Sequence, residues 1–282
     1  MCSKIKNNKV IFLDVDGTLV EPMERPSALT IEAIKKAREN GHKVFICTGR
    51  NLPIISKEII EIGFDGIIAS AGGYIETDGK VLFDDIMPEE KVQECLRIFH
   101  KHDVYCRIED KKGVYIDKKM EELLKIAKVN PANSELVRMQ KEMEGMLDIY
   151  PFDRYEKKGA YKINFTCTSL EHLEGPKKEM GEEFHFVIYP FWGSDGAYNG
   201  EIIRKGIEKG DALVKICEYY GVPLSQTIAF GDSMNDYSMI KKAKLGIAMG
   251  NAADELKEAA DMVCKSVKEE GIYHAFKELG LI

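Results

Sequence analysis

An apolar run that ends in two acids constrains the fold of this chain more than any other feature. Residues Val10–Leu13 are apolar, and the pentapeptide Asp14-Val15-Asp16-Gly17-Thr18 follows directly. In an open α/β sheet the carboxyl ends of the strands border the ligand crevice. Two carboxylates at that place are costly unless a cation or a chemical task compensates them. The pattern therefore predicts a buried strand that carries Asp14 and Asp16 to a functional crevice.

Strand and helix patterns alternate in the first and last thirds of the chain. The expected strands are Val10–Leu13, Val44–Cys47, Gly66–Ala69, Thr227–Phe230 and Leu245–Met249. The expected helices are Thr30–Asn40, Pro53–Ile62, Asp211–Tyr220, Asp236–Ala243, Ala253–Ala260 and Gly271–Leu279. Thr30 is the expected N-cap of its helix and Gly41 the residue that stops it. Short apolar strands separated by helices of this length predict right-handed βαβ units and a parallel sheet.

The middle of the chain, from about Pro88 to Pro190, has a different pattern. Helices are expected at Glu89–His102, Lys118–Lys128 and Ser134–Met143, and strands at Val104–Glu109, Gly113–Asp117, Ala160–Thr166 and Glu183–Tyr189. The strands alternate polar and apolar residues, which predicts an α+β block with one sheet face in solvent. We therefore expect an α/β core domain built from residues 1–84 and 193–282, with an inserted domain over residues 85–192.

Composition narrows the class of protein. The chain has 282 residues, 44% hydrophobic and 31% charged, and a formal charge of −7. The negative charge argues against a broad nucleic-acid surface. The seven cysteines are scattered without a CxxC pair, as in a reduced cytoplasmic protein. The N-terminus does not look like a signal peptide, and no apolar run approaches a membrane span. We expect a monomer or small homo-oligomer.

Four separated pieces of the sequence fall at expected strand ends or helix starts. They are Asp14 and Asp16, then Thr48-Gly49-Arg50, then Lys209, then Asp232 to Asp236. Carboxylates without histidine or cysteine beside them suit Mg²⁺ rather than zinc. One carboxylate can attack a phosphoryl group, with Lys209 and a metal drawing charge from the phosphoryl oxygens. The second acid can then transfer protons, and Thr48 with nearby N–H groups can hold the remaining oxygens.

These motifs resemble those of the haloacid dehalogenase (HAD) superfamily. The first motif is Asp14-Val15-Asp16-Gly17-Thr18-Leu19, the second Thr48, the third Lys209, and the fourth Gly231-Asp232 with Asn235-Asp236. The insertion between Thr48 and Lys209 is similar to the C2 cap of Cof-like hydrolases of subfamily IIB. The resemblance implies a Rossmann-like core, an α+β cap over the site, and Mg²⁺-dependent hydrolysis of phosphate esters.

The resemblance also implies a role for each motif residue. Asp14 corresponds to the nucleophile and Asp16 to the general acid and base. The phosphate-binding residues would be Thr48, Gly49, Arg50, Lys209 and Asn235. The metal set would be Asp14, the Asp16 carbonyl, Asp232 and Asp236, with Asp236 in the outer shell. Many relatives have Asn-Gly-Ala where this chain has Ala71-Gly72-Gly73, so a site role for that Asn does not carry over.

Several of these residues can also be interpreted as purely structural. Asp232 and Asp236 by themselves also fit a helix N-cap with an acid in the first turn. Asn251 is expected to cap a helix, and Trp192 to be a packing anchor. No histidine falls in a motif, so none is expected to be catalytic. Four polar residues on expected strands of the insertion are predicted to be solvated rather than to face the substrate: Arg107, Glu109, Lys162 and Asn164.

The leading hypothesis is a phosphatase of a small phosphorylated metabolite. A sugar phosphate is the first expectation, because relatives with this cap often take one, and a phosphorylated cofactor is the next. Two alternatives stay open at this stage. A phosphomutase would use the same aspartyl-phosphate chemistry, and a ligand-sensing homologue would keep the core without turnover.

Overall fold

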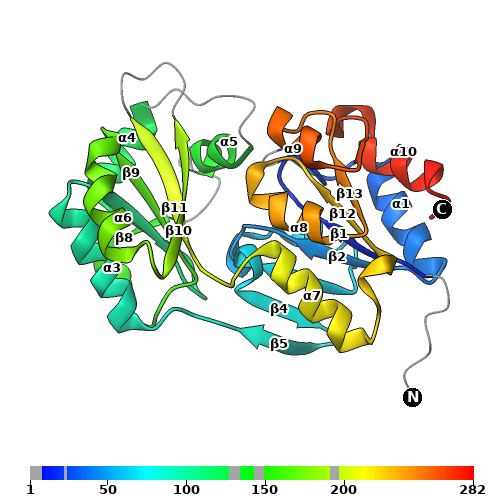
Figure 1. Ribbon diagram of the computed structural model, residues 1–282, viewed down its shortest axis with the longest axis horizontal. Helices are drawn as coiled ribbons and strands as arrows, with labels where there is room; N and C mark the ends of the chain where they lie inside the picture. The colour runs from blue at the N-terminus through cyan, green and yellow to red at the C-terminus, as the bar shows by residue number, and fades with distance from the viewer. Residues whose placement is uncertain (1–7, 22–23, 127–133, 143–148, 191–196) are drawn as a thin grey trace.

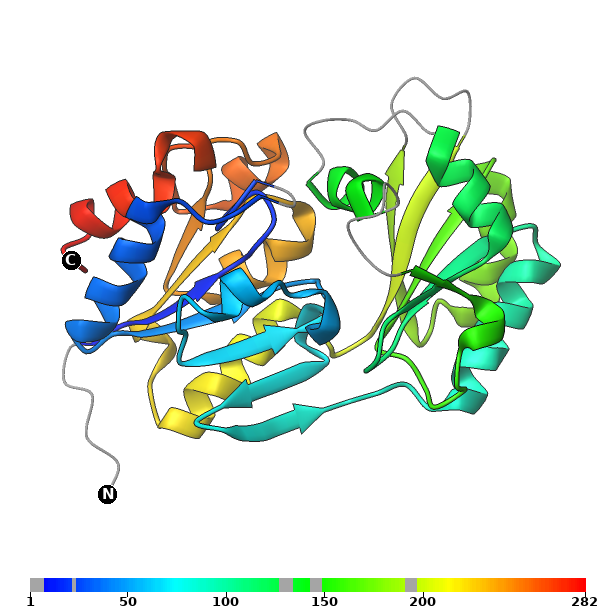
Figure 2. The same ribbon diagram turned by 180° about the vertical axis from the view of Figure 1, so that it is seen from behind.

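The computed structural model describes residues 8–21, 24–126, 134–142, 149–190 and 197–282, and Figures 1 and 2 show it from opposite sides. The chain forms two sheets, an eight-stranded one and a six-stranded one. We call the part around the first sheet the core and the part around the second the cap. Trp192, expected to be a packing anchor, lies outside the described residues.

The core sheet has the strand order β14-β13-β12-β1-β2-β3-β4-β5. Its strands are β1 (Val10–Leu13), β2 (Lys43–Cys47), β3 (Gly66–Ala69), β4 (Tyr74–Thr77), β5 (Lys80–Asp84), β12 (Thr227–Gly231), β13 (Leu245–Ala248) and β14 (Met262–Val263). Each strand from β14 to β3 in this order pairs in parallel with the next one. Strands β4 and β5 extend the sheet as an antiparallel hairpin that the sequence did not indicate. The expected parallel sheet is confirmed.

Apolar side chains cover both faces of the core sheet. All four residues of β1 are buried, and the Phe12 and Phe45 rings on adjacent strands stack at a centroid distance of 5.5 Å. Each such buried side chain contributes about 1.5–3 kcal/mol of transfer free energy. The core helices are α1 (Ala28–Glu39), α2 (Lys57–Ile60), α7 (Lys209–Tyr220), α8 (Tyr237–Lys242), α9 (Asp254–Ala259) and α10 (Gly271–Glu278). Figure 1 shows α1 and α10 on one face and α7 and α8 on the other.

Two predicted core helices differ from the structure in their capping or their continuity. Helix α1 starts before Thr30, and its N-cap is Ser27, whose Oγ accepts the Thr30 N–H at 3.0 Å. The predicted helix over 53–62 is broken into a 3-10 turn (Leu52–Ile54) and the short α2, because Ile55 and Ser56 are extended. The stop at Gly41 is confirmed by its left-handed φ of 89°.

The cap sheet has the strand order β10-β11-β9-β6-β7-β8. Its strands are β6 (Tyr105–Glu109), β7 (Val114–Ile116), β8 (Ile149–Pro151), β9 (Lys162–Cys167), β10 (Phe184–Pro190) and β11 (Tyr198–Arg204). The cap helices are α3 (Glu89–Lys101), α4 (Lys118–Ile126), α5 (Ser134–Lys141) and α6 (Glu174–Met180). The predicted hairpin of the insertion is confirmed as the antiparallel pair β6 and β7.

The two faces of the cap sheet differ in chemistry because polar and apolar residues alternate along its strands. Apolar residues such as Ile108 and Phe165 pack with Phe99 of α3 on the outer face. Polar residues at the intervening positions, among them Arg107 and Asn164, form the other face. That face is buried, so the predicted solvent-facing sheet is wrong. We call it the inner face.

Figures 1 and 2 show why the inner face is buried. It looks toward the core, and α5 lies between the two sheets on the side away from the connecting segments. The core and the cap therefore enclose polar side chains from both parts of the chain.

Two connecting segments join the core and the cap. One follows β5 and the other follows β11, and the Arg204 guanidinium pairs with the Asp85 carboxylate between them. Strand β11 pairs with both β9 and β10, whereas the sequence predicted residues from 193 onward to be core. The pattern missed β11 because the polar Asn199 and Glu201 and the small Gly200 hide its alternation. We propose that the inserted domain extends to about Arg204.

Two further sequence expectations concern thiols and membranes. All six cysteines in the described part of the chain are free, and five of them are buried, as predicted for small core residues. None of the described helices has both the length and the apolar character needed to cross a bilayer.

Candidate active site

The motif residues converge at one edge of the core sheet because three neighbouring strands end there. Leu13 at the end of β1 is in register with Ile46 of β2 and with Phe230 of β12. The Asp14 N–H continues this ladder by donating to the Phe230 carbonyl at 3.1 Å. Asp14, Thr48 and Asp232 therefore leave adjacent strands at the same edge, as the parallel-sheet prediction requires.

Lys209, the first residue of α7, ties two of the motif carboxylates together. Its Nζ lies 2.6 Å from Asp14 Oδ1 and 2.6 Å from Asp236 Oδ1, and it donates to Asn235 Oδ1 at 3.2 Å. The Lys209 side chain has no exposed surface. An ammonium this deeply buried is tolerable only with such partners.

The buried charges shift one another's pKa values. Burial raises the pKa of Asp14 to about 8; the charge of Asp236 adds to this effect, and Lys209 opposes it. Burial alone would lower the pKa of Lys209, but the adjacent Asp14 and Asp236 outweigh it and hold that pKa well above its ordinary value. Burial also raises the pKa of the nearby Cys47 thiol, so Cys47 is not a thiolate nucleophile at neutral pH.

Three buried carboxylates are close enough to hold one cation. Oxygen atoms of Asp14, Asp232 and Asp236 all lie within 4.8 Å of one another. Gly17 has a φ of 80°, and a Cβ there would overlap the Asp232 carboxylate, so the first motif needs glycine at this position. An all-oxygen donor set of this kind fits Mg²⁺.

Asp236 has a different environment from the other two acids. Its Oδ2 accepts the N–H groups of Asp232 and Ser233 at 3.0 and 3.2 Å, while Oδ1 accepts from Lys209. Both oxygens are thus engaged with protein donors. This arrangement agrees with the outer-shell role expected for Asp236 and leaves Asp14 and Asp232 as the carboxylates better placed for direct ligation.

Asp16 is held by arginines from both parts of the molecule. Arg50 Nε and Nη2 donate to its two oxygens at 2.7 Å each. Arg138 Nε, from α5 of the cap, lies 3.5 Å from Asp16 Oδ2. The sequence predicted that Arg50 binds phosphate, whereas in this structure its guanidinium pairs with Asp16.

The loop after β2 links the core to the cap. The Thr48 hydroxyl is buried and accepts the Arg50 N–H at 3.0 Å. The Gly49 carbonyl accepts from Lys162 Nζ of β9 at 3.3 Å. Asn51 Nδ2 donates to the Asp110 carbonyl at the tip of the β6–β7 hairpin. The predicted phosphate-binding loop is therefore also the place where the cap rests on the core.

The turn after β3 has a strained backbone. Ser70, Ala71 and Gly72 have consecutive positive φ values of 51°, 55° and 109°. Non-glycine residues rarely adopt this region, and such strain concentrates at functional sites. A Cβ at Gly72 would crowd the Glu208 carbonyl, so glycine is needed there. This turn places Ala71 in the wall of a cavity that Lys209 also lines.

The cap residues predicted to be solvated are instead buried on the inner face. Arg107 and Glu109 are fully enclosed and pair with each other at 3.1 Å. Lys162 Nζ lies 2.5 Å from Glu201 Oε2. Asn164 is also buried, directly opposite Arg107 in the ladder. The prediction is wrong because alternation along a strand separates two faces but does not show what covers each of them.

Several inner-face residues had no signal in the sequence. Arg138 and Glu142 of the α5 region are fully buried and pair with each other, and Arg107 Nη1 lies 2.7 Å from Glu142 Oε2. An arginine and a glutamate four residues apart look the same as an exposed helical pair. Glu201 was missed together with strand β11.

Asn251 lies in the site region but does not cap a helix. Its Nδ2 donates to the Gly17 carbonyl at 2.7 Å, and its Oδ1 accepts the Val267 N–H at 3.0 Å. The N-cap of α9 is Ala253 instead. The predicted cap role is wrong, and Asn251 braces the first motif against the C-terminal segment.

A comparison with known families agrees with this geometry. The profile of the haloacid dehalogenase-like hydrolases matches residues 11–276, which include every motif described above. The chain belongs to this family. The resemblance inferred from four short motifs is thereby confirmed over nearly the whole chain.

Individual relatives support the same assignment. The chain is 29% identical to "Putative phosphatase YkrA" of Bacillus subtilis (strain 168), over 98% of this chain and 99% of that protein. It is 27% identical to "Pyridoxal phosphate phosphatase YbhA" of Escherichia coli (strain K12), over 90% and 92%. The solved HAD subclass IIB sugar phosphatase BT4131 matches with a TM-score of 0.75 at 26% identity, over 98% of this chain and all of that one. The HAD member described here is a phosphatase with a Rossmann-like core and a cap.

Proposed function

We propose that this HAD phosphatase hydrolyses a phosphate monoester of a small metabolite, depends on Mg²⁺, and works through an aspartyl-phosphate on Asp14. The observation that carries the proposal is the buried cluster in which Lys209 bridges Asp14 and Asp236 at 2.6 Å each. A nucleophilic carboxylate beside a fixed ammonium at a strand end is the arrangement that phosphoryl transfer needs. By likeness to its named relatives, a sugar phosphate or a phosphorylated cofactor is the expected substrate.

The residues present fit a bound Mg²⁺ ion. Asp14, the Asp16 carbonyl and Asp232 would hold it, and Asp236 would orient Lys209 and the loop through its contacts with the N–H groups of residues 232 and 233. Bound there, the cation would withdraw charge from the phosphoryl oxygens and favour the ionised form of Asp14. The pKa of about 8 for Asp14 without metal makes the second effect important.

The protein residues then perform two transfers of the phosphoryl group. An oxygen of the Asp14 carboxylate attacks phosphorus, the bond from phosphorus to the ester oxygen breaks, and Asp16 gives a proton to the departing oxygen. A water molecule next attacks phosphorus and gives its proton to Asp16, and the bond from phosphorus to Asp14 breaks. Lys209, Thr48 and Asn235 hold the phosphoryl oxygens throughout.

Asp16 has partners to accommodate during this cycle. Each of its two oxygens accepts one hydrogen bond from Arg50, so a proton on Asp16 occupies a remaining lone pair or takes the place of one of these bonds. We propose that Arg50 positions Asp16 between turnovers and that the ester oxygen of the substrate replaces one of its contacts.

The decisive test is the variant Asp14→Asn. It should lower kcat for p-nitrophenyl phosphate with Mg²⁺ by at least about ten-thousandfold, because the amide cannot attack phosphorus. Acid quenching and mass spectrometry of the wild type should find the phosphoryl group on Asp14. Asp211→Asn, which alters a surface ion pair with Lys242, is the matched control.

Two results would contradict the proposal. Near-normal turnover by Asp14→Asn would remove the nucleophile assignment. Product analysis that finds an isomerised phosphate ester in place of free phosphate would favour the phosphomutase alternative, which shares the same chemistry at Asp14.

A further inference from the structure

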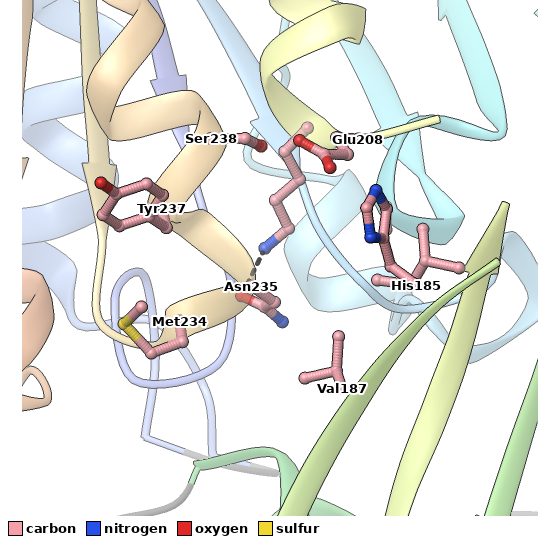
Figure 3. Close-up of a pocket in the computed structure, with 10 residues that line it drawn as sticks. His185, Val187, Glu208, Met234, Asn235, Tyr237 and Ser238 are labelled. Atoms are coloured by element: carbon pink, nitrogen blue, oxygen red, sulfur yellow. Dashed lines mark hydrogen bonds between the residues drawn. The ribbon is translucent and has the colours of Figure 1, made fainter. Parts of the chain in front are cut away.

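A cavity of about 140 Å³ lies beside Lys209, between the core and the cap. Figure 3 shows Met234, Asn235 and Tyr237 of the core on one side and His185 and Val187 of β10 on the other. Its volume is well below the roughly 300 Å³ at which pockets for drug-sized ligands begin. The cavity itself therefore has room for about one ring, and a longer ligand would extend out of its open side.

The cavity is continuous with the phosphoryl site. Lys209 and Asn235 both line it, and Lys209 Nζ contacts Asp14 Oδ1 at 2.6 Å. A phosphate held by Lys209 and Asn235 would have its ester group within reach of this space. The group that fills the cavity is thus the part of the substrate that leaves as an alcohol.

The walls of the cavity are largely apolar. Met234 and Tyr237 line it and are 42% and 43% exposed. Val187 faces them from the cap in Figure 3, and Ile203 of β11 lines the same space. A ligand with an apolar face would therefore contact apolar side chains from both the core and the cap.

The charge of the lining limits the ligand further. Among the described residues around the cavity, Lys209 is the only permanent cation, and Asp14 and Asp236 already neutralise it. Glu208, at the start of α7, adds a negative charge. A second phosphate or a carboxylate held within this cavity would meet Glu208, whereas Lys162 and Arg204 line a neighbouring pocket that shares Ala71 and Ile203.

We propose that the alcohol released by this phosphatase is uncharged, about the size of one ring and apolar on one face, and that Val187 and Met234 select it. This inference rests on the proposed function, because it assigns the leaving group of that same reaction. It favours a phosphorylated heterocycle, as in a phosphorylated cofactor, over the fully hydroxylated sugar phosphate expected first. His185, at the polar end of the cavity, can exchange a hydrogen bond with a ring substituent.

Three alkyl phosphates separate the alternatives. Benzyl phosphate and glucose 6-phosphate both release a primary alcohol attached to a six-membered ring, and only the first has an apolar ring. Fructose 1,6-bisphosphate carries a second anionic group. With Mg²⁺, the wild type should have a kcat/KM for benzyl phosphate at least about tenfold above that for the other two.

Variants in the walls should reduce this preference. Met234→Gln and Val187→Thr should each raise KM for benzyl phosphate about tenfold with little change in kcat, because they weaken binding of the leaving group in the ground and transition states alike. Leu224→Gln is the control, since Leu224 is 41% exposed and lies outside the cavity. Glu208→Gln should raise kcat/KM for the bisphosphate about fivefold by removing a repulsion.

The possible failures are distinguishable. A wild-type preference for glucose 6-phosphate or the bisphosphate, or wall variants that keep the wild-type preference, would overturn the assignment of the cavity while the phosphatase stands. A wild type that hydrolyses none of the three esters and no aryl phosphate would overturn the proposed function and this inference with it.

Discussion

The core sheet holds its buried charged side chains beyond the ends of its strands, whereas the cap sheet holds buried charged side chains within its strands. Asp14 and Asp232 follow β1 and β12 at one edge, while Arg107, Glu109 and Asn164 occupy alternate positions of β6 and β9. Both sets are buried. In the core, these side chains are buried because they lie at the carboxyl edge of a parallel sheet. In the cap, they are buried because α5 and the core cover the inner face.

This difference suggests a division of labour. Polar groups at strand ends project from a rigid edge, which suits groups that must hold reacting atoms in place. The cap meets the core through contacts such as Lys162 of the inner face with Gly49 and Arg138 of α5 with Asp16. We therefore expect changes in the core cluster to lower the rate of chemistry, and changes in the cap to affect cap stability and substrate preference.

The largest effect is expected from Lys209→Met in the core. Loss of the ammonium removes the donor to Asp14 and Asp236 and leaves their charges to repel each other, so kcat/KM for an aryl phosphate should fall at least about a thousandfold. Lys242→Met is the matched control, because Lys242 pairs with Asp211 at the surface and is 43% exposed. A decrease of less than tenfold in Lys209→Met would break the assignment of the core cluster to chemistry.

Arg107→Met tests the cap side of the comparison. Glu109 and Glu142 lose a fully buried partner, which should lower the free energy of unfolding of the cap by about 3 kcal/mol. Urea unfolding monitored by circular dichroism measures this change. Lys112→Met removes an exposed ion pair with Glu156 and should change stability by less than about 1 kcal/mol. Equal effects of the two variants would mean that the inner-face network does not hold the cap together.

Mg²⁺ should stabilise the core through its carboxylates. At a concentration one hundred times its Kd, the ion should raise the free energy of unfolding by about 2.7 kcal/mol. Chelation should abolish turnover, and added Mg²⁺ should restore it. Asp232→Asn should lose the thermal shift and Asp211→Asn should keep it. A shift that persists in Asp232→Asn would place the cation elsewhere.

The smallest effect concerns two histidines with opposite pH dependence. A hydrogen bond with Asp117 raises the pKa of His100 in the cap, so its stabilisation is complete below about pH 6.5 and is lost as pH rises through the folded-state pKa. Burial lowers the pKa of His42 in the core, so protonation of His42 destabilises the fold as pH falls below about 6.5.

Thermal melts between about pH 5.5 and about pH 8 measure both contributions, because this range extends roughly one unit below and one and a half units above the ordinary histidine pKa. His100→Gln should lose stability mainly at the acid end, and His42→Gln should lose less there than at neutral pH, with shifts of about 1–2 °C. His100 is 43% exposed, so solvent screening keeps its contribution small. Identical pH profiles for the two variants would refute the opposite signs.

The core was predictable from sequence because the residues proposed to be catalytic lie next to local signatures of strands and helices. An apolar run followed by Asp14 or Asp232 marks a parallel strand and its exit, and the order of the motifs along the chain is specific to the family. Even the start of α1 was misplaced by only two residues, since both Ser27 and Thr30 are suitable capping residues.

The cap was predictable in its elements but not in its contacts. Alternation in β6 and β9 correctly separated two faces, yet the burial of Arg107, Glu109 and Asn164 depends on α5 and the core, which are distant in sequence. Strand β11 was missed because its inner-face positions are polar. Polar residues at these positions are explained only by the charged side chains that they face in the folded structure. The pairing of Arg50 with Asp16 also had no local signal in the sequence, because it joins residues from two different loops.

The amino-acid sequence by itself determined the family and the strand edge that carries Asp14, Asp16, Thr48 and Asp232, and it is the source of the chemistry proposed for that edge. These follow from short apolar runs and the residues directly after them, which act locally. Only the tertiary structure decided which cap residues are enclosed, which partners Asp16 has, and that Val187 and Met234 share one cavity. These depend on how two separately folded sheets face each other, and no periodicity along one strand contains that information.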